Sequence, residues 1–522
     1  MKVMTSVLAP PVTGVLPEPR QGTARSATLP PVLVGAVAFV ISAAASWQPS
    51  YWGDEAASVM SAQRSLGSLF NLLGHIDAVH GTYYLFLHFW IEAFGASEFS
   101  TRLPSAIAVG IAAAGIVVLV RTLINPRVAV IAGLVFAVLP RVTYMGAEAR
   151  SMAIATAIGV WLTVLLVHVL RSAPPQSAAQ RRVRLLWWTG YAVLLSFGIY
   201  MFLYVALLIP AHAVTVLLMN RKREALFGWT ASVAAGLVLA IPVLWFGAHE
   251  RQQIAFIGRR PDVSLTDAAV HQWFGNRPLA VAAWALIALA VVVVAVGVLR
   301  HRREYGRSAT TSTATTLIIA LAWMLIPSAI LFLGTRFLTP MYSLRYLSIC
   351  APAAAIAIAI GIASFRSRWL RISALLLVVV LAVPTYLSQR GEFGKNFGSD
   401  WRQAADVIAQ SATDGDAVVF DESNRPSRNV RLAMHLYPDA FTGLKDVTLA
   451  SPYQENDGLW DRVAPLEEST NSLVGTNRVW LLQYSGSSEE EAGTDVATLK
   501  SLGFTESSVT LVNRTTITEM TR

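Results

Sequence analysis

Long apolar stretches, repeated from residue 31 to residue 388, restrict the fold of this chain more than any other feature. The hydrocarbon core of a bilayer is about 30 Å thick, and a helix of about 20 apolar residues crosses it. By that criterion the sequence predicts eleven membrane-spanning helices, near residues 31–49, 103–121, 127–143, 150–170, 186–201, 203–219, 226–247, 279–298, 315–334, 346–364 and 370–388. Only 14% of the residues are charged, whereas about a quarter are charged in a typical soluble protein. We therefore expect a multi-pass α-helical membrane protein.

The basic residues predict how the chain is oriented. A formal net charge of +9 is compatible with nucleic acid binding, but the arginines lie in short runs between apolar stretches, such as residues 300–303. Cytoplasmic loops of membrane proteins carry this excess of arginine and lysine. The basic runs fall in alternate loops, as an odd number of spans with a cytoplasmic N-terminus requires. We expect a multi-pass protein of the plasma (inner) membrane, with no nucleic acid partner and an extracytoplasmic C-terminus.

Three segments outside the predicted spans differ in character. Residues 1–30 are rich in proline, serine and threonine, and predict a disordered cytoplasmic tail. Residues 50–102 form a long first outer loop, whose amphipathic pieces at 56–73 and 83–94 are expected to lie along the membrane interface. Residues 389–522 regain charge and predict a small extracytoplasmic α/β domain, with strands at 416–420 and 478–482 and helices at 401–411 and 495–502.

Two adjacent carboxylates, Asp54 and Glu55, follow the first predicted span. Neighbouring carboxylates at a membrane surface repel each other and lose solvation, unless a partner or a reaction uses them. One of them could be the general base that removes the proton of an attacking sugar hydroxyl. Alternatively, both are helix N-terminal residues that interact with the helix dipole. The sequence leaves both interpretations open.

A second polar cluster, residues 75–84, contains two histidines, an aspartate and two tyrosines, among them His80, Tyr83 and Tyr84. Such side chains can ligate a metal or donate hydrogen bonds to a sugar or a phosphate. Their spacing matches no established zinc pattern. We therefore assign no metal site and favour hydrogen bonding to a sugar or phosphate.

Arginines form the third group, Glu148 with Arg150 and Arg345 with Tyr346. Both arginines fall at the outer membrane boundary of the predicted topology, where the charge bias disfavours them. A guanidinium group binds phosphate with two parallel hydrogen bonds, and a lipid phosphate would lie at this depth. The alternative is structural, with snorkelling arginines or an Arg150–Glu148 pair.

Several strings in this order resemble the GT-C superfamily of polyprenyl-phosphate-dependent membrane glycosyltransferases, in particular bacterial relatives of protein O-mannosyltransferase and aminoarabinose transferase (family 39-type) and actinobacterial mannosyltransferases. The strings are the acidic pair after the first span, the Tyr83-Tyr84 helix start, residues 94–105, Glu148-Ala149-Arg150-Ser151-Met152-Ala153, Leu344-Arg345-Tyr346-Leu347, and Asp400-Trp401-Arg402-Gln403-Ala404-Ala405. Two departures are Met152, where relatives have tyrosine, and residues 79–84, where many have Pro-Pro-Leu-Tyr-Tyr.

The resemblance implies a GT-C transmembrane domain at residues 31–388, with a catalytic outer loop, and a separate domain at 389–522. It implies transfer of a sugar, mannose by analogy, from a polyprenyl-phosphate donor to a lipid-linked, glycan or protein acceptor of the cell envelope, with inversion. Asp54 would be the catalytic base, supported by Glu55. Cations would stabilise the departing phosphate. In this scheme His80, Tyr83, Tyr84, Glu148, Arg150, Arg345 and Tyr346 bind substrate, no cofactor is certain, and a divalent metal is left open.

Two other classes of protein fit a multi-pass chain. A lipid or sugar transporter, or flippase, also needs many spans with a few polar residues, but transporters often contain duplicated halves and helices broken near the membrane midplane. No such repeat is visible in the sequence, and the polar residues gather at the outer boundary instead. The third alternative is a non-catalytic scaffold of the cell envelope that binds partners through its C-terminal domain.

Overall fold

The computed structural model describes residues 24–250, 264–305, 311–338, 341–486 and 489–522. Most of the predicted tail at residues 1–30 therefore lies outside the described residues. The first helix, α1 (Ala24–Ala43), already begins within that predicted tail.

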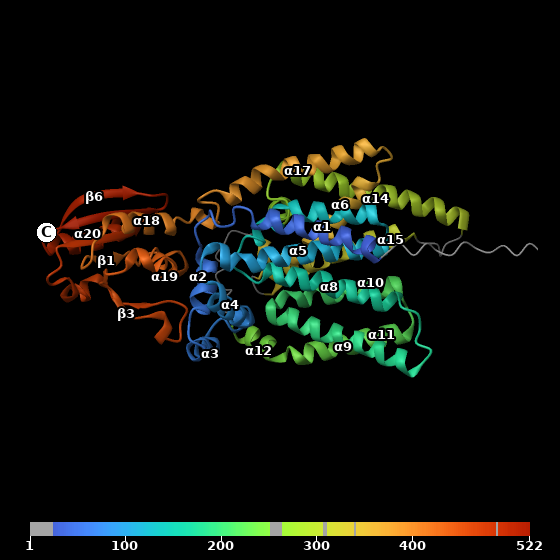
Figure 1. Ribbon diagram of the computed structural model, residues 1–522, viewed down its shortest axis with the longest axis horizontal. Coiled ribbons are helices and arrows are strands. Elements are labelled where there is room, and N and C mark those ends of the chain that lie inside the picture. The colour runs from blue at the N-terminus through green and yellow to red at the C-terminus, as the bar shows by residue number, and fades with distance from the viewer. Residues whose placement is uncertain (1–23, 251–263, 306–310, 339–340, 487–488) are drawn as a thin grey trace, which may run out of the picture.

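A bundle of long helices forms one part of the molecule (Figure 1). Each of the eleven predicted spans coincides with a helix or a helix pair: α1, α5 (Glu98–Leu123), α6 (Pro126–Val138) with α7 (Pro140–Met145), α8 (Met152–Arg171), α9 (Ala178–Met201), η2 (Leu203–Leu207) with α10 (Leu208–Met219), α11 (Arg223–Leu239) with α12 (Ile241–His249), α14 (Arg277–Tyr305), α15 (Ser312–Phe337), η4 (Leu344–Cys350) with α16 (Ala351–Ala363), and α17 (Arg368–Arg390). A short helix, α13 (Leu265–His271), precedes α14.

Not all of these helices are equally suited to cross a bilayer. Among the described residues, six are long and apolar enough by themselves, and the bent pair α11–α12 is a seventh span if counted as one. Three further apolar helices are shorter, at Thr28–Ala43, Pro126–Val138 and Leu203–Met219, while α9 carries three arginines in its first turns. The chain is a multi-pass membrane protein, and length and composition support six or seven spans among the described residues, fewer than the eleven predicted.

Three of the predicted spans have a proline just after an internal break or kink. Pro140 begins α7 after the break at Leu139, and Pro242 lies in the first turn of α12, where α11 and α12 meet at 58°. Pro352 lies in the first turn of α16, after the 3₁₀ turn η4. Proline is tolerated in a first helical turn, but its missing N–H and fixed φ interrupt a helix that would continue through it. Each of these three spans contributes residues to one cavity.

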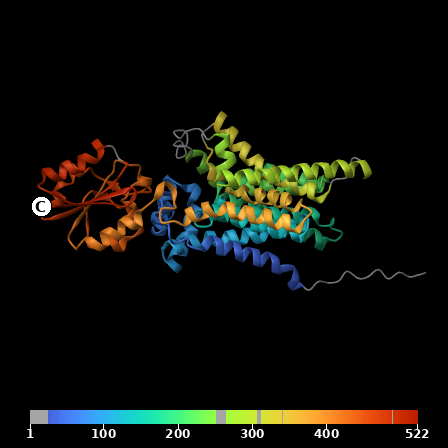
Figure 2. The same ribbon diagram turned by 90° about the horizontal axis from the view of Figure 1, so that it is seen from above.

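A layer of short helices, α2 (Gly53–Ala62), α3 (Leu66–His75), η1 (Ala78–His80) and α4 (Gly81–Phe94), lies between the bundle and the C-terminal part (Figures 1 and 2). Nearly all of α2 is buried, and its apolar side chains share a core with Trp401 and Phe420 of the C-terminal part. The expectation that this piece lies along the membrane surface is therefore wrong for α2. The C-terminal domain supplies a second apolar surface, so α2 is covered on both sides.

The C-terminal part is an α/β domain, as predicted. Its main sheet has the strand order β2-β1-β5-β7-β6, in which β1 is parallel to β2 and β5, and β7 is antiparallel to β5 and β6. The elements are α18 (Trp401–Ser411), β1 (Ala417–Phe420), α19 (Leu432–Leu436), β2 (Lys445–Asp446), β3 (Leu449–Ser451), β4 (Arg462–Val463), β5 (Arg478–Tyr484), α20 (Glu489–Ser501), β6 (Thr505–Leu511) and β7 (Thr515–Thr521), with 3₁₀ turns η5 (Asn396–Gly398), η6 (Pro426–Arg428), η7 (Pro438–Phe441), η8 (Tyr453–Glu455), η9 (Leu466–Glu468) and η10 (Thr470–Leu473).

Candidate functional site

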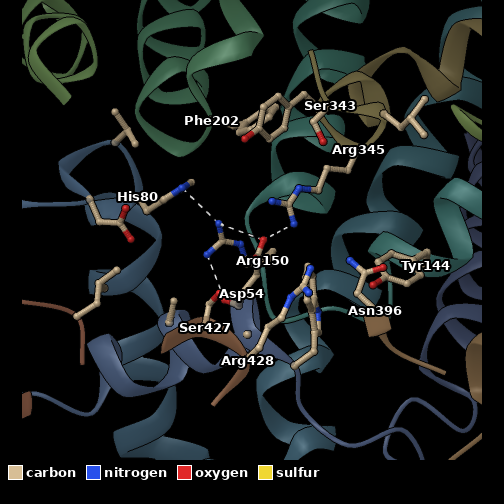
Figure 3. Close-up of a pocket in the computed structure, with 18 of the residues that line it drawn as sticks. Asp54, His80, Tyr144, Arg150, Phe202, Ser343, Arg345, Asn396, Ser427 and Arg428 are labelled. Atoms are coloured by element: carbon tan, nitrogen blue, oxygen red, sulfur yellow. Dashed lines mark hydrogen bonds and ion pairs between the residues drawn. The ribbon is translucent and has the colours of Figure 1, made fainter. Parts of the chain in front are cut away.

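A cavity of about 980 Å³ lies where the bundle, the α2–α4 layer and the C-terminal domain meet (Figure 3). All three of these spans contribute residues to its wall. Arg141 lies in α7, after the first break, and Gly247 lies in α12, after the second. Arg345 lies in η4, just before α16. Irregular backbone at membrane depth is tolerated where it lines such a cavity. The breaks therefore bring polar side chains from distant spans to one place.

Asp54 lies in the centre of this site (Figure 3). It is the second residue of α2, and its side chain is 23% exposed. Arg345 forms a close ion pair with Oδ2 of Asp54, and Arg150 Nη2 lies 3.9 Å from the same oxygen. Arg150 also donates to the Asp54 carbonyl and to Ser58 Oγ, both at 3.2 Å. One carboxylate is thus held between two guanidinium groups that both line the cavity.

The charges around Asp54 decide its protonation. Burial raises the pKa of Asp54, but Arg345 and Arg150, with a smaller effect of His80, outweigh burial and hold the pKa below its ordinary value. Asp54 is therefore ionised at neutral pH and can accept a proton.

His80 contacts the same group of charges. Its Nε2 lies 3.3 Å from Arg150 Nη2. Burial and the neighbouring Arg150 lower the pKa of His80 to about 4, against the opposing charges of Asp77 and Asp54. The imidazole is therefore neutral at neutral pH, and Nε2 accepts the hydrogen bond from Arg150, since a guanidinium group can only donate. His80 positions Arg150 rather than adding a charge to the site.

Glu55 points away from the cavity and is fully buried. Arg102 of α5 donates to both of its carboxylate oxygens at 2.7 Å, and the Ala149 N–H donates to Oε1 at 2.9 Å. Burial raises the pKa of Glu55, yet Arg102 and Lys395 bring it below its ordinary value. Because Ala149 precedes Arg150, Glu55 fixes the loop that presents Arg150 to the cavity.

Lys395 and Glu148 complete this buried cluster. Lys395 lies 3.7 Å from Glu55 Oε1, donates to the Ala147 carbonyl, and lies 4.8 Å from the centre of the Tyr144 ring. Burial raises the pKa of Glu148 and lowers the pKa of Lys395. Glu148 Oε1 has no hydrogen-bond partner among the described side chains and backbone. Glu148 is thus part of a structural cluster and does not line the described cavity wall.

The side of the cavity that faces the bundle also has apolar and aromatic residues. Tyr346 stacks on Tyr204 with ring centres 4.8 Å apart, and Phe202 packs beside both. Leu203 and Leu344 line the same wall. A wall of this kind, next to Arg345, combines an apolar surface with a cation.

A family model and two solved structures resemble this chain. A family model described as dolichyl-phosphate-mannose-protein mannosyltransferase matches residues 82–246. ArnT from Cupriavidus metallidurans bound to undecaprenyl phosphate has a similar structure, with a TM-score of 0.56 and 14% identity over 95% of this chain and 98% of that chain. Its apo structure gives a TM-score of 0.54 at 13% identity, with the same coverage.

The chain shares the fold of ArnT, and its residues 82–246 match the mannosyltransferase family model. The resemblance predicted from the sequence motifs is therefore confirmed, as is the fold class. The oligosaccharyltransferase of Archaeoglobus fulgidus, in its apo form, is more distant, with a TM-score of 0.49 and 11% identity over 87% of this chain and 69% of that chain. No curated protein is significantly similar in sequence.

The cavity brings together most, but not all, of the residues singled out from the sequence. Asp54, His80, Arg150, Arg345 and Tyr346 line the cavity. The remaining four, Glu55, Tyr83, Tyr84 and Glu148, are buried behind its wall. The Tyr84 hydroxyl donates to Asp77 Oδ2 at 2.7 Å, and Asp77 itself lines the cavity. Direct substrate contact by these four is therefore not what the geometry favours, because other side chains cover them.

Several residues of the site were not predicted. Arg102 and Lys395 hold Glu55, and Arg141 and Tyr144 line the cavity just after the Pro140 break. The C-terminal domain adds Arg425, Ser427, Arg428 and Arg514 to the wall. The proline inside the span predicted at residues 127–143 was a sequence signal for a break, but nothing in the sequence places the C-terminal residues beside Asp54.

The question of a divalent metal rests on the available ligands. Among the described residues, no group of three or more histidine, cysteine or acidic side chains lies close enough to hold a metal ion. Asp54 is held by two arginines instead. The described side chains therefore do not fit a metal site.

Proposed function

We propose that this GT-C protein transfers a sugar, with mannose as the first candidate, from a polyprenyl-phosphate donor to a cell-envelope acceptor on the outer face of the membrane, with inversion. The observation that carries the proposal is the ionised Asp54, held between Arg150 and Arg345 in the cavity. A base and cations for a leaving phosphate are the two components that such a transfer needs.

The reaction divides these roles between Asp54 and the arginines. Asp54 accepts the proton of an acceptor hydroxyl while the oxygen attacks the anomeric carbon. The bond between that carbon and the phosphate oxygen breaks on the opposite face, and the lipid phosphate leaves with the bonding electron pair. Arg345 and Arg150 stabilise the charge that develops on it, because guanidinium groups form strong hydrogen bonds with phosphate. Attack opposite to departure inverts the anomeric centre.

Because Asp54 forms an ion pair with Arg345, donor binding also changes the pKa of Asp54. A phosphate that binds Arg345 competes with Asp54 for the same guanidinium group. Since Arg345 is the strongest charge that lowers the pKa of Asp54, donor binding is expected to raise this pKa and make Asp54 a better base. The base is thus activated only when a donor is present.

The apolar wall supports a lipid-linked donor. Phe202, Tyr204 and Tyr346 lie beside Arg345, so a phosphate at Arg345 could place its polyprenyl chain against the bundle. The similar ArnT structure is bound to undecaprenyl phosphate. The family model that matches residues 82–246 is named for a dolichyl-phosphate-mannose enzyme, which supports mannose, whereas the ArnT likeness keeps other sugars under consideration.

A labelled donor tests this proposal. The full chain, in proteoliposomes, is incubated with undecaprenyl-phosphate [¹⁴C]mannose and with the arabinose and aminoarabinose analogues, in the presence of an envelope extract as acceptor. We expect the label to enter a product with one of these donors, and Arg345→Gln to raise the donor KM. Label that crosses the bilayer on its original lipid, without a new covalent product, would contradict the proposal and favour the flippase alternative.

A further inference from the structure

The two sides of the cavity differ in charge balance. The bundle and the α2–α4 layer contribute three arginines, Arg141, Arg150 and Arg345, and three carboxylates, Asp54, Asp77 and Glu250. The C-terminal domain contributes three arginines, Arg425, Arg428 and Arg514, and none of the described residues that line this side is acidic. The excess of positive charge in the cavity therefore comes from the C-terminal domain.

The charge of Arg514 is partly balanced by a carboxylate. Its Nε lies 3.4 Å from Asp400 Oδ1, behind the cavity wall, and its guanidinium group lies 5.2 Å from the centre of the Trp401 ring. Arg428 lies close enough for its charge to oppose that of Arg514. Two like charges on one wall of a cavity favour the binding of an anion.

The segment that carries Arg425 and Arg428 is fixed against α2. A side-chain carbon on Gly53 would lie only 2.1 Å from the Ser427 carbonyl oxygen, so this glycine permits direct backbone contact between the turn η6 and the residue before Asp54. The Arg428 N–H donates to the Arg425 carbonyl at 2.8 Å and closes the turn. Arg428 lines the cavity and is among the side chains drawn around Asp54 in Figure 3.

This arrangement separates two anion sites. The donor phosphate belongs at Arg345, next to the apolar wall, and the acceptor hydroxyl must reach Asp54. Arg425 and Arg428 flank Ser427, which contacts Gly53, so they reach the cavity from the C-terminal domain and not from the apolar wall. A cation there does not serve the lipid phosphate, but it can bind a charged group on the molecule that brings the hydroxyl.

We propose that the acceptor carries an anionic group near its attacking hydroxyl, a phosphate ester or a carboxylate, and that Arg425 and Arg428 bind it. This inference rests on the proposed function, since it assigns the acceptor of the same reaction. Guanidinium groups bind either anion with paired hydrogen bonds. The C-terminal domain thus selects the acceptor, and the membrane domain binds the donor.

Binding of three small probes tests the inference without turnover. Purified full chain in phosphatidylcholine nanodiscs is titrated with octyl mannoside, octyl mannoside 6-phosphate and octyl mannuronide. The wild-type protein is expected to bind at least one charged probe about tenfold more tightly than the neutral one, as one charge-assisted interaction allows. The phosphate and the carboxylate probes distinguish which anion is preferred. Equal binding of all three probes would overturn the proposal.

Variants then locate the preference. The double variant Arg425→Gln/Arg428→Gln is expected to lose the preference for the charged probe, whereas Lys500→Gln, which removes one exposed cation of the same domain, should keep it. A preference that survives in the double variant would overturn the proposal. The wild-type comparison needs no variant, so the proposal stays testable if the double variant does not fold.

A donor titration on the same variants separates the two sites. The Kd of undecaprenyl phosphate for the double variant should lie within about twofold of the wild-type Kd. The two replaced arginines act on the donor site only through long-range electrostatics, which solvent and salt screen. A large loss of undecaprenyl phosphate binding would assign these arginines to the donor and overturn the inference. Failure of the proposed transfer would instead be seen in the labelled-donor assay, while the probe preference remained.

Discussion

The two faces of α2 give two adjacent carboxylates opposite roles. Asp54 faces a cavity, is partly exposed, and is held by Arg345 and Arg150, which a substrate can also reach. Glu55 faces the protein interior, is fully buried, and is held by Arg102, with Lys395 nearby. Both carboxylates have a lowered pKa, yet only one has partners that a ligand could take away.

The difference shows that an ion pair can either be exchanged for a ligand during the reaction or serve only to stabilise the fold. At Glu55, hydrogen bonds from Arg102 and the Ala149 N–H satisfy the buried charge, so that it does not need a ligand. At Asp54 the partners belong to the cavity wall, so a donor phosphate can replace the carboxylate. The chemistry therefore depends on which way each side chain points, not on the residue type.

Replacing Glu55 should have the largest effect on stability. Glu55→Ala leaves the buried Arg102 without its carboxylate partner, and breaking a buried pair in this way costs about 3–5 kcal/mol. The free energy of unfolding, or the temperature at which the detergent-solubilised protein aggregates, measures this loss. The matched variant Asp54→Ala should change stability much less, since Asp54 is partly exposed. Equal losses in both variants would contradict the distinction between the two faces.

Replacing Lys395 should have a smaller effect of the same kind. Lys395→Met keeps the length of the side chain but removes the cation near Glu55 and the donor to the Ala147 carbonyl. We expect a loss of about 1–3 kcal/mol in the free energy of unfolding, the cost of leaving a buried acceptor unsatisfied. The removal of an exposed cation in Lys500→Gln is the control. An unchanged stability in Lys395→Met would show that Lys395 does not support Glu55.

The pH dependence of transfer should distinguish free enzyme from donor-bound enzyme. A base works above its pKa, so activity is lost as the pH falls through the pKa of Asp54. In the free enzyme Arg345 and Arg150 lower this pKa, and the acid limb of kcat/KM should lie below the ordinary Asp value of about 3.9. In the donor complex the phosphate competes with Asp54 for Arg345, which raises the pKa of Asp54. The acid limb of the pH profile of kcat should therefore lie at higher pH than the acid limb of kcat/KM.

His80 needs a control in this measurement, because its pKa is lowered to about 4 by burial and Arg150. It would therefore titrate in the same range. The variant His80→Asn should keep the acid limb if Asp54 is the titrating base. If the acid limb of kcat lies at the same pH as the acid limb of kcat/KM, or at a lower pH, the donor does not release Asp54 from Arg345.

The broad architecture could be predicted from the sequence because hydrophobicity determines it locally. Apolar stretches of bilayer length gave the positions of the spans, and the return of charge after residue 389 gave the α/β domain. The breaks at Pro140, Pro242 and Pro352 were not predicted, since the apolar composition continues through them. Whether such a proline kinks, ends or restarts a helix depends on neighbouring helices and on the cavity that they leave.

The site could be predicted only in part, for a similar reason. Asp54, Arg150 and Arg345 stood out because charge is rare at the predicted membrane boundary. The direction of the Glu55 side chain and the burial of Tyr83 depend on how α2 and α4 pack against the rest of the protein. The neighbouring residues in the sequence do not determine this packing. Arg428 lies far from Asp54 in sequence, and only the contact of η6 with Gly53 brings it to the cavity.

A single-turnover assay with Asp54→Asn tests the central claim most directly. Asparagine keeps the shape of the side chain but cannot accept the proton, and loss of a general base costs about 10²–10⁴-fold in rate. With undecaprenyl-phosphate sugar prebound, we predict a loss of this size in the rate of labelled product formation, with donor binding retained. Transfer by Asp54→Asn at the wild-type rate would contradict the account.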